Sequence, residues 1–145
     1  MISHSTTETK EIAIHFLEKI ILKGLDKTAT VISLHGDLGS GKTTFVQLVA
    51  KTLDVHEQLQ SPTFVIMKNY KLPHSTFKNF IHIDAYRLNS VSEIEKLGWS
   101  EIISNPENLV FVEWPEKIEG IMPKNSIRVD FKFIDENSRE INTVF

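Results

Sequence analysis

The feature that most constrains the fold of this chain is a glycine-rich stretch between two apolar segments. Residues 36–43, GDLGSGKT, match the pattern G-x-x-x-x-G-K-[ST] at every fixed position. They follow the apolar run TVISLH at 30–35 and precede FVQLVAKTL at 45–53, where apolar residues recur at helical spacing. At average residue frequencies, chance would produce the pattern in roughly one chain in 200 of this length. The stretch therefore predicts a strand at 30–35, a phosphate-binding loop and a helix over 42–53.

Each residue type in the loop serves phosphate binding for a separate reason. Glycines let the backbone curve closely round a polyphosphate, so that successive N–H groups point inward. The following helix adds its unpaired N–H groups and the positive end of its dipole. Lys42 supplies a full positive charge, and the Thr43 hydroxyl is a hard oxygen ligand for Mg²⁺. We expect a nucleotide cradle made of Gly36, Gly39, Ser40, Gly41, Lys42, Thr43 and Thr44.

The remaining segments predict an α/β fold. Apolar residues four apart predict a helix from Thr9 to Leu22, and a helix carrying apolar residues as far as Ile103 opens at the capping box Ser90 to Glu93. Further strands are expected within 61–70 and at 79–84 and 108–114, and a hairpin at 126–133 and 139–145. We predict one domain over residues 1–145, a three-layer P-loop NTPase-like fold whose central mixed sheet is flanked by helices and ends in a C-terminal β-hairpin.

Composition excludes several classes of protein. The 145 residues include no cysteine, which rules out disulfides, a thiolate nucleophile and a cysteine-ligated zinc site. No signal peptide and no run of 18 apolar residues is present, so we expect a cytoplasmic protein without a membrane partner. The net charge of −3 argues against independent binding to nucleic acid, although work on RNA within a larger assembly remains open.

A bound Mg²⁺ needs an acid opposite the phosphate-binding loop, and two predicted strands end in one. FIHID ends in Asp84 and LVFVE ends in Glu113. Ligands of α/β sheets collect at the carboxyl ends of the strands, so either acid is suitably placed. The residues alone do not choose between them, because both could serve, one of them through water.

Other candidate residues carry weaker signals. Ser61-Pro62-Thr63 lies where some nucleotide hydrolases place a threonine that senses the terminal phosphate, but a loop rigidified by proline is the commoner interpretation. Arg87 could contact a phosphate or a partner protein, but an arginine at an ordinary surface position is equally common. His82, two residues before Asp84, could form a metal pair with it, but the strand period alone places both on one face, so a structural role is favoured. Trp114 is more often a core residue by base rate, although a tryptophan at the end of an active strand could contact a partner or a nucleotide.

Among P-loop proteins, a small ATPase fits the sequence best. The guanine-recognising tetrapeptide N-K-x-D is absent, which disfavours a GTPase. Small kinases usually close an arginine-bearing lid over two substrates, and this chain has three arginines and no extended lid insertion. The alternatives are a small-molecule P-loop kinase, in which Asp84 would deprotonate a substrate hydroxyl, and a nucleotide-gated binding module without useful catalysis.

Four separated motifs, GDLGSGKTTF, SPTF, HIDAYRL and VEWPE, occur in an order and spacing that closely resemble the TsaE family over nearly the whole chain. The family is the small P-loop ATPase of bacterial tRNA threonylcarbamoyladenosine biosynthesis. The resemblance implies a Mg²⁺-dependent ATPase that is weak alone and is stimulated by a threonylcarbamoyl transferase subunit with its dimerisation partner, a complex of the TsaD–TsaB type. That complex modifies the adenosine next to the anticodon of ANN-decoding tRNAs, so tRNA would be reached indirectly.

The resemblance also implies roles for particular residues. Glu113 of the EW pair would be the Mg²⁺ ligand together with Thr43. Asp84 would be an active-site acid that orients the attacking water or the metal shell, Thr63 the switch-like residue, and Thr9 a neighbour of the nucleotide base. The expected catalytic residues are therefore Lys42, Asp84 and Thr63.

Overall fold

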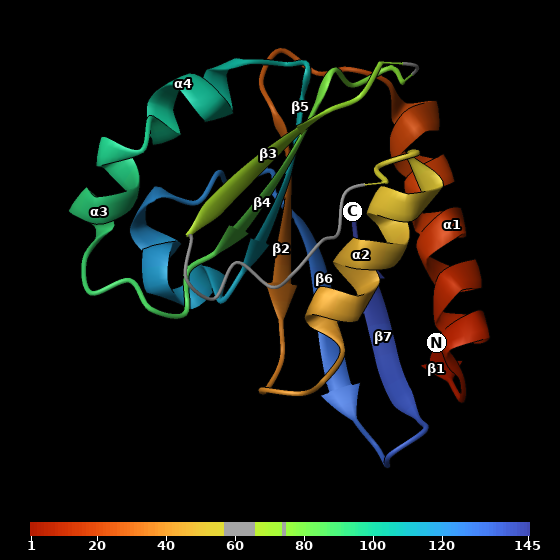
Figure 1. The fold of residues 1–145 in the computed structure, drawn as a ribbon. Coiled ribbons are helices and arrows are strands. Elements are labelled where there is room, and N and C mark those ends of the chain that lie inside the picture. The colour runs from red at the N-terminus through yellow and green to blue at the C-terminus, as the bar shows by residue number, and fades with distance from the viewer. Residues whose placement is uncertain (57–65, 74) are drawn as a thin grey trace.

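A mixed β-sheet forms the centre of the molecule, and helices cover both of its faces (Figure 1). The computed structural model describes residues 1–56, 66–73 and 75–145. The seven strands of the described sheet lie in the order β1-β7-β6-β2-β5-β4-β3. The strands are β1 Ile2–Ser3, β2 Thr30–His35, β3 Met67–Lys71, β4 Asn79–Asp84, β5 Asn108–Glu113, β6 Ile127–Phe133 and β7 Arg139–Val144. The helices are α1 Thr6–Lys23, α2 Lys42–Thr52, α3 Val91–Lys96, α4 Trp99–Ser104 and the 3₁₀ helix η1 Pro115–Ile121.

Parallel pairing in the middle of the sheet brings chain segments that are far apart in sequence to one edge. β2 pairs in parallel with β5 and β6, and β5 pairs in parallel with β4. The outer pairs β3–β4, β6–β7 and β1–β7 are antiparallel. The register sets Glu113 opposite Leu34 on one side and opposite Asp84 on the other. Both candidate acids therefore lie at the same edge of the sheet as the end of β2, from which the glycine-rich loop begins.

Two apolar cores separate the three layers. On one face, α1 and α2 pack side by side against the sheet, and Phe45 makes edge-on ring contacts with Phe16 at 5.5 Å and with Phe131 at 5.4 Å (Figure 1). On the other face, Ile94, Trp99 and Ile118 from α3, α4 and η1 cover residues of the central strands. Because side chains alternate along a strand, β5 sends Leu109 and Phe111 toward α2 and sends Val110 and Val112 to the opposite face. Glu113 lies two residues after Phe111, so its side chain faces α2 like those of Leu109 and Phe111.

The sequence predicted most of these elements. The strands at 30–35 and 79–84, the helix after the loop, the strand ending at Glu113 and the C-terminal hairpin are confirmed. The first helix begins at Thr6 rather than Thr9, because the Ser5 hydroxyl accepts a hydrogen bond from the Glu8 N–H at 3.1 Å and caps it. Of the segment 61–70, β3 occupies the end from Met67, and residues 57–65 lie outside the described part of the chain.

One helix prediction is wrong. The helix expected to run from Ser90 as far as Ile103 is two short helices, α3 and α4, because Gly98 between them adopts the left-handed conformation with φ 88°. The capping box is also absent: the Ser90 hydroxyl pairs with that of Ser92 at 2.8 Å and caps no helix N–H. Strand β1 and the 3₁₀ helix η1 were not predicted.

Across the described residues, no helix has both the length and the apolar character that a membrane crossing requires.

Candidate nucleotide-binding site

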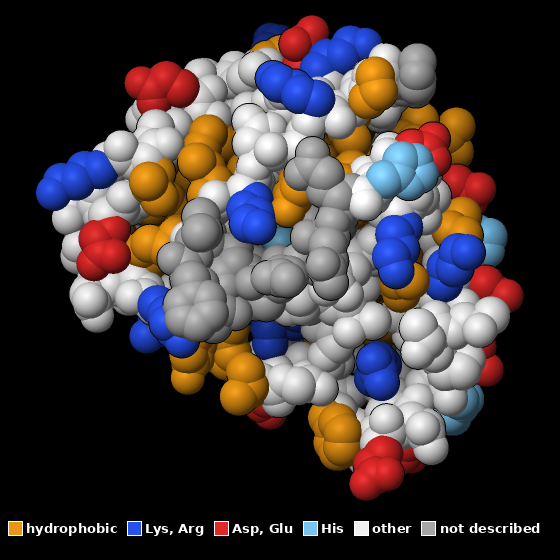
Figure 2. All heavy atoms as spheres, in the orientation of Figure 1, with side chains coloured by type: hydrophobic (Ala, Val, Ile, Leu, Met, Phe, Trp, Pro, Cys, Tyr) orange, Lys and Arg blue, Asp and Glu red, His pale blue; other side chains and the backbone are white. Residues whose placement is uncertain are grey.

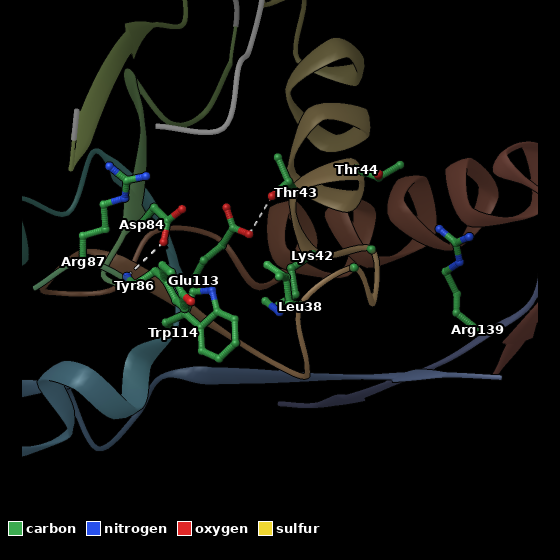
Figure 3. A pocket seen from close by; sticks show the side chains of 12 residues that line it. Leu38, Lys42, Thr43, Thr44, Asp84, Tyr86, Arg87, Glu113, Trp114 and Arg139 are labelled. Atoms are coloured by element: carbon green, nitrogen blue, oxygen red, sulfur yellow. Dashed lines mark hydrogen bonds between the residues drawn. The ribbon is translucent and has the colours of Figure 1, made fainter. Parts of the chain in front are cut away.

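A cavity of about 300 Å³ lies over the loop between β2 and α2. Figure 3 shows its lining side chains arranged from Asp84 and Arg87 at one end, past Lys42 and Thr43, to Arg139 at the other. The lining residues are Leu38, Gly39, Gly41, Lys42, Thr43, Thr44, Asp84, Tyr86, Arg87, Glu113, Trp114 and Arg139. They come from the loop, the start of α2, the ends of β4 and β5 and the start of β7.

Left-handed backbone conformations shape the loop. Gly36, Gly39 and Gly41 have φ values of 142°, 77° and 103°, which side-chain-bearing residues rarely adopt. Gly36 is also crowded, since a Cβ atom there would lie 2.4 Å from the backbone oxygen of Phe131 and 2.8 Å from Ser40 Oγ. Gly41 is the N-cap of α2 and has no side chain to occupy the helix N-terminus, so the unpaired N–H groups of the first turn stay accessible to a ligand.

We expect Gly36→Ala to lower the free energy of unfolding by about 1–3 kcal/mol, because alanine meets both an unfavourable φ and a backbone oxygen that cannot move aside. Denaturant unfolding of the purified variant measures the change. Gly120→Ala is the matched control, because a Cβ atom on that glycine would meet no heavy atom within 4 Å and its φ is not left-handed. Equal unfolding midpoints for the two variants would contradict this account of the loop.

The Lys42 side chain folds back over its own loop. Its ammonium group donates to the carbonyl oxygens of Gly36 and of Asp37, the latter at 2.8 Å, and lies 4.4 Å from the centre of the Trp114 ring. The residue is 5% exposed, and this burial lowers the pKa of the ammonium below its ordinary value, while nearby carboxylates, chiefly that of Glu113, act in the opposite direction. The charge is therefore held over the loop by neutral acceptors, which an anion could replace.

A short chain of hydrogen bonds joins the loop to β4 and β5. Thr43 Oγ1 donates to Glu113 Oε1 at 2.7 Å, and the other carboxylate oxygen, Oε2, lies 2.6 Å from His82 Nε2. Because a carboxylate only accepts hydrogen bonds, the imidazole donates to it. Glu113 is 2% exposed and His82 is 1% exposed. The carboxylate is thus fixed on one side by a buried ring and turned toward the start of α2 on the other.

This donor set fits a magnesium ion. A hydroxyl and a carboxylate are hard oxygen ligands, and Mg²⁺ is typically held by one or two protein oxygens together with substrate phosphates and water. Within the described ranges, no group of three or more His, Cys, Asp or Glu residues could hold a metal ion. Thr43 and Glu113 are the residues that would supply the protein's share.

Asp84 and two aromatic residues border the same cavity. Asp84 Oδ1 accepts a hydrogen bond from the Tyr86 backbone N–H at 3.0 Å, and the Tyr86 and Trp114 rings lie 5.0 Å apart (Figure 3). Trp114 has φ 59°, a left-handed conformation that is costly for a residue with a large side chain. That conformation turns the chain directly after Glu113 and sets the indole over Lys42.

The structure brings most of the predicted site residues together at one cavity, but Gly36, Ser40 and Thr9 do not line it. Lys42, Thr43, Asp84 and Glu113 border one cavity. Ser40 is in the loop but is 1% exposed, and its side chain points inward beneath the Lys42 ammonium. Thr9 is fully buried in α1, where its hydroxyl lies 2.8 Å from Ser3 Oγ, and it does not line the cavity. Thr63 lies outside the described residues.

Three residues contribute more to the site than the sequence indicated. His82 touches Glu113, and its position two residues before Asp84 on the same strand face was the available signal. Trp114 follows a candidate acid directly, yet base rates assigned it to the core. Arg139 reaches the cavity from the C-terminal hairpin, nearly 100 residues after the loop, and no local pattern marks it.

Comparison with known proteins gives a consistent result. The family model described as threonylcarbamoyl adenosine biosynthesis protein TsaE matches residues 3–141. Two similar relatives are named tRNA threonylcarbamoyladenosine biosynthesis protein TsaE: that of Rickettsia bellii is 37% identical over 97% of this chain and 91% of its own, and that of Bacillus subtilis is 36% identical over 79% and 69%. A crystal structure of YdiB from Bacillus subtilis superimposes with a TM-score of 0.70 at 28% identity, covering 97% of this chain and 80% of that one. The chain therefore belongs to the TsaE family and has its P-loop NTPase-like fold.

Proposed function

We propose that this protein binds ATP with Mg²⁺, hydrolyses the ATP, and thereby supports formation of threonylcarbamoyladenosine on tRNA. The single observation that carries the proposal is the 2.7 Å hydrogen bond between Thr43 and Glu113. It joins the last residue of the phosphate-loop pattern to an acid from a strand about 70 residues later, which is the arrangement that a metal-bound triphosphate requires. The names of the family and of its relatives supply the pathway.

The residues around the cavity suggest how each contributes to hydrolysis. Backbone N–H groups of the loop and of the first turn of α2 would bind the phosphates, and Lys42 would exchange its carbonyl partners for phosphate oxygens. Thr43 and Glu113 would hold Mg²⁺, which when bound neutralises charge on the phosphates. Asp84 would orient a water molecule whose oxygen bonds to the terminal phosphorus as ADP leaves. On the family resemblance, Thr63 would sense the terminal phosphate and Thr9 would lie near the base.

A partner complex completes the proposal. Leu38 and Tyr86 line the cavity and remain 80% and 49% exposed, so its mouth carries apolar surface that a partner could cover. We infer that this partner is a threonylcarbamoyl transferase subunit with its dimerisation partner, of the TsaD–TsaB type, in the cytoplasm. The tRNA would be met only through that complex: the net charge is −3, and Figure 2 shows Lys and Arg side chains spread over the visible face rather than gathered in one patch.

Phosphate release with and without the purified transferase complex tests the proposal. We expect slow ATP hydrolysis by the isolated protein and a rise on the order of 10³-fold when the complex is added, because completion of an active site in trans gives increases of that size. The same reaction with labelled ATP and a pool of metabolites distinguishes the alternatives. A phosphorylated metabolite would indicate a kinase, and ATP-dependent complex formation without phosphate release would indicate a binding module.

A further inference from the structure

Arg139 lies against the phosphate-binding loop although it belongs to the opposite end of the chain. It is the first residue of β7, paired in register with Phe133 of β6. Its side chain covers Gly41: the three atoms nearest to a Cβ position on that glycine are Arg139 Nη1 at 3.0 Å, Cδ at 3.2 Å and Cζ at 3.7 Å. The side chain also lines the cavity. The hairpin therefore delivers a guanidinium group to the N-terminus of α2.

The charges around Arg139 favour an anion at this place. Arg139 covers Gly41 at the positive end of the α2 dipole, and Lys42 lines the same cavity, so a third positive group adds repulsion. The structure records no hydrogen bond or ion pair for the Arg139 guanidinium with any residue that it describes. Arg128 on the neighbouring strand differs, because it pairs with Asp130 at 2.7 Å. A phosphate group would supply the partner that the protein does not.

The layout of the cavity indicates which phosphate. Figure 3 shows Glu113 and Asp84 on one side of Lys42 and Arg139 on the other, beyond Thr44. If the terminal phosphates and Mg²⁺ lie between Lys42, Thr43 and Glu113, the chain of phosphates runs past Thr44, and its nucleoside end reaches Arg139. We propose that Arg139 binds the α-phosphate of the nucleotide. The inference rests on the proposed function, since it assumes that the cavity takes a nucleotide in this direction.

The test is nucleotide affinity of the full-length Arg139→Gln variant, measured by calorimetric titration with ATP and with ADP, each with and without Mg²⁺. We expect affinity to fall about 10-fold, equally for ATP and ADP and regardless of Mg²⁺, because the α-phosphate is common to both and is remote from the metal. The loss should shrink as salt rises, since a partly exposed ion pair is screened. Arg139→Lys, which keeps the charge, should lose less.

Lys132→Gln is the matched control, because it removes one positive charge from the neighbouring strand at an exposed position outside the cavity lining. Unchanged affinity in Arg139→Gln would overturn the inference, as would a loss confined to ATP or one that salt does not affect. If the unaltered protein bound neither nucleotide, the proposed function itself would fail. Thermal unfolding of each variant shows that it is folded, and Arg139→Lys carries the test should the glutamine variant be unstable.

Discussion

Replacing Lys42 with alanine is expected to reduce ATP hydrolysis by on the order of 10²- to 10³-fold, because it removes the ammonium group that lies over the loop. The residue is 5% exposed, so its charge acts in surroundings from which water is largely excluded, where an interaction with phosphate is strong. The ammonium is now held by two neutral carbonyl oxygens and the Trp114 ring, and phosphate oxygens carrying negative charge are better acceptors. Phosphate release in the presence of the transferase complex measures the loss, and calorimetric titration with ATP measures the accompanying fall in affinity.

Lys51→Ala is the matched control for this variant. Lys51 lies in the last turn of the same helix, is exposed, and does not line the cavity. The two variants lose the same charge, so a difference between them reports the position of the ammonium group rather than the net charge. ATP affinity and turnover that stayed unchanged in Lys42→Ala would rule out this loop as the phosphate-binding site.

The local part of the site could be predicted from the sequence because its geometry is encoded by neighbouring residues. The loop needs glycine where φ is left-handed, and Gly36, Gly39 and Gly41 fall at three such positions. The lysine and threonine follow directly on the first turn of α2, so a run of eight residues specifies the phosphate-binding half of the cavity. The strands on each side follow from their apolar runs for the same reason.

The remaining part of the site depends on pairing between distant segments, which a single sequence does not specify. Asp84 and Glu113 both end buried strands, and the sequence leaves them equivalent. The register makes them neighbours, but it is the hydrogen bond from Thr43 that distinguishes Glu113, and this depends on how α2 sits against β5. Arg139 reaches the loop only because β6 pairs with β2 and the hairpin then returns toward it. The helix broken at Gly98 was mispredicted because one glycine within a helical pattern is often tolerated.

The two acids are expected to differ in how far their loss changes the Mg²⁺ dependence of hydrolysis. In Glu113→Gln, the Mg²⁺ concentration for half-maximal phosphate release should rise at least about 10-fold, because loss of even an indirect ligand contact commonly costs 10- to 100-fold in metal affinity. Asp84→Asn should mainly lower the maximal rate, because the Thr43 hydroxyl donates to Glu113 rather than to Asp84, and Asp84 is the residue that we propose orients the attacking water. Titrating Mg²⁺ at saturating ATP separates the two effects.

Amide variants are the appropriate choice because Glu113 is buried between two polar partners. Alanine at 113 would leave His82 and Thr43 without their acceptor, and a loss of stability would then obscure the metal effect. Glutamine keeps the size of the side chain and an accepting oxygen for one partner, and it removes the charge with less disturbance than alanine, so its Mg²⁺ dependence reports the ligand role. A larger shift in Asp84→Asn than in Glu113→Gln would reverse the assignment and make Asp84 the metal ligand. The hydrogen bond from Thr43 to Glu113 would then have a structural role, because it joins the start of α2 to the end of β5.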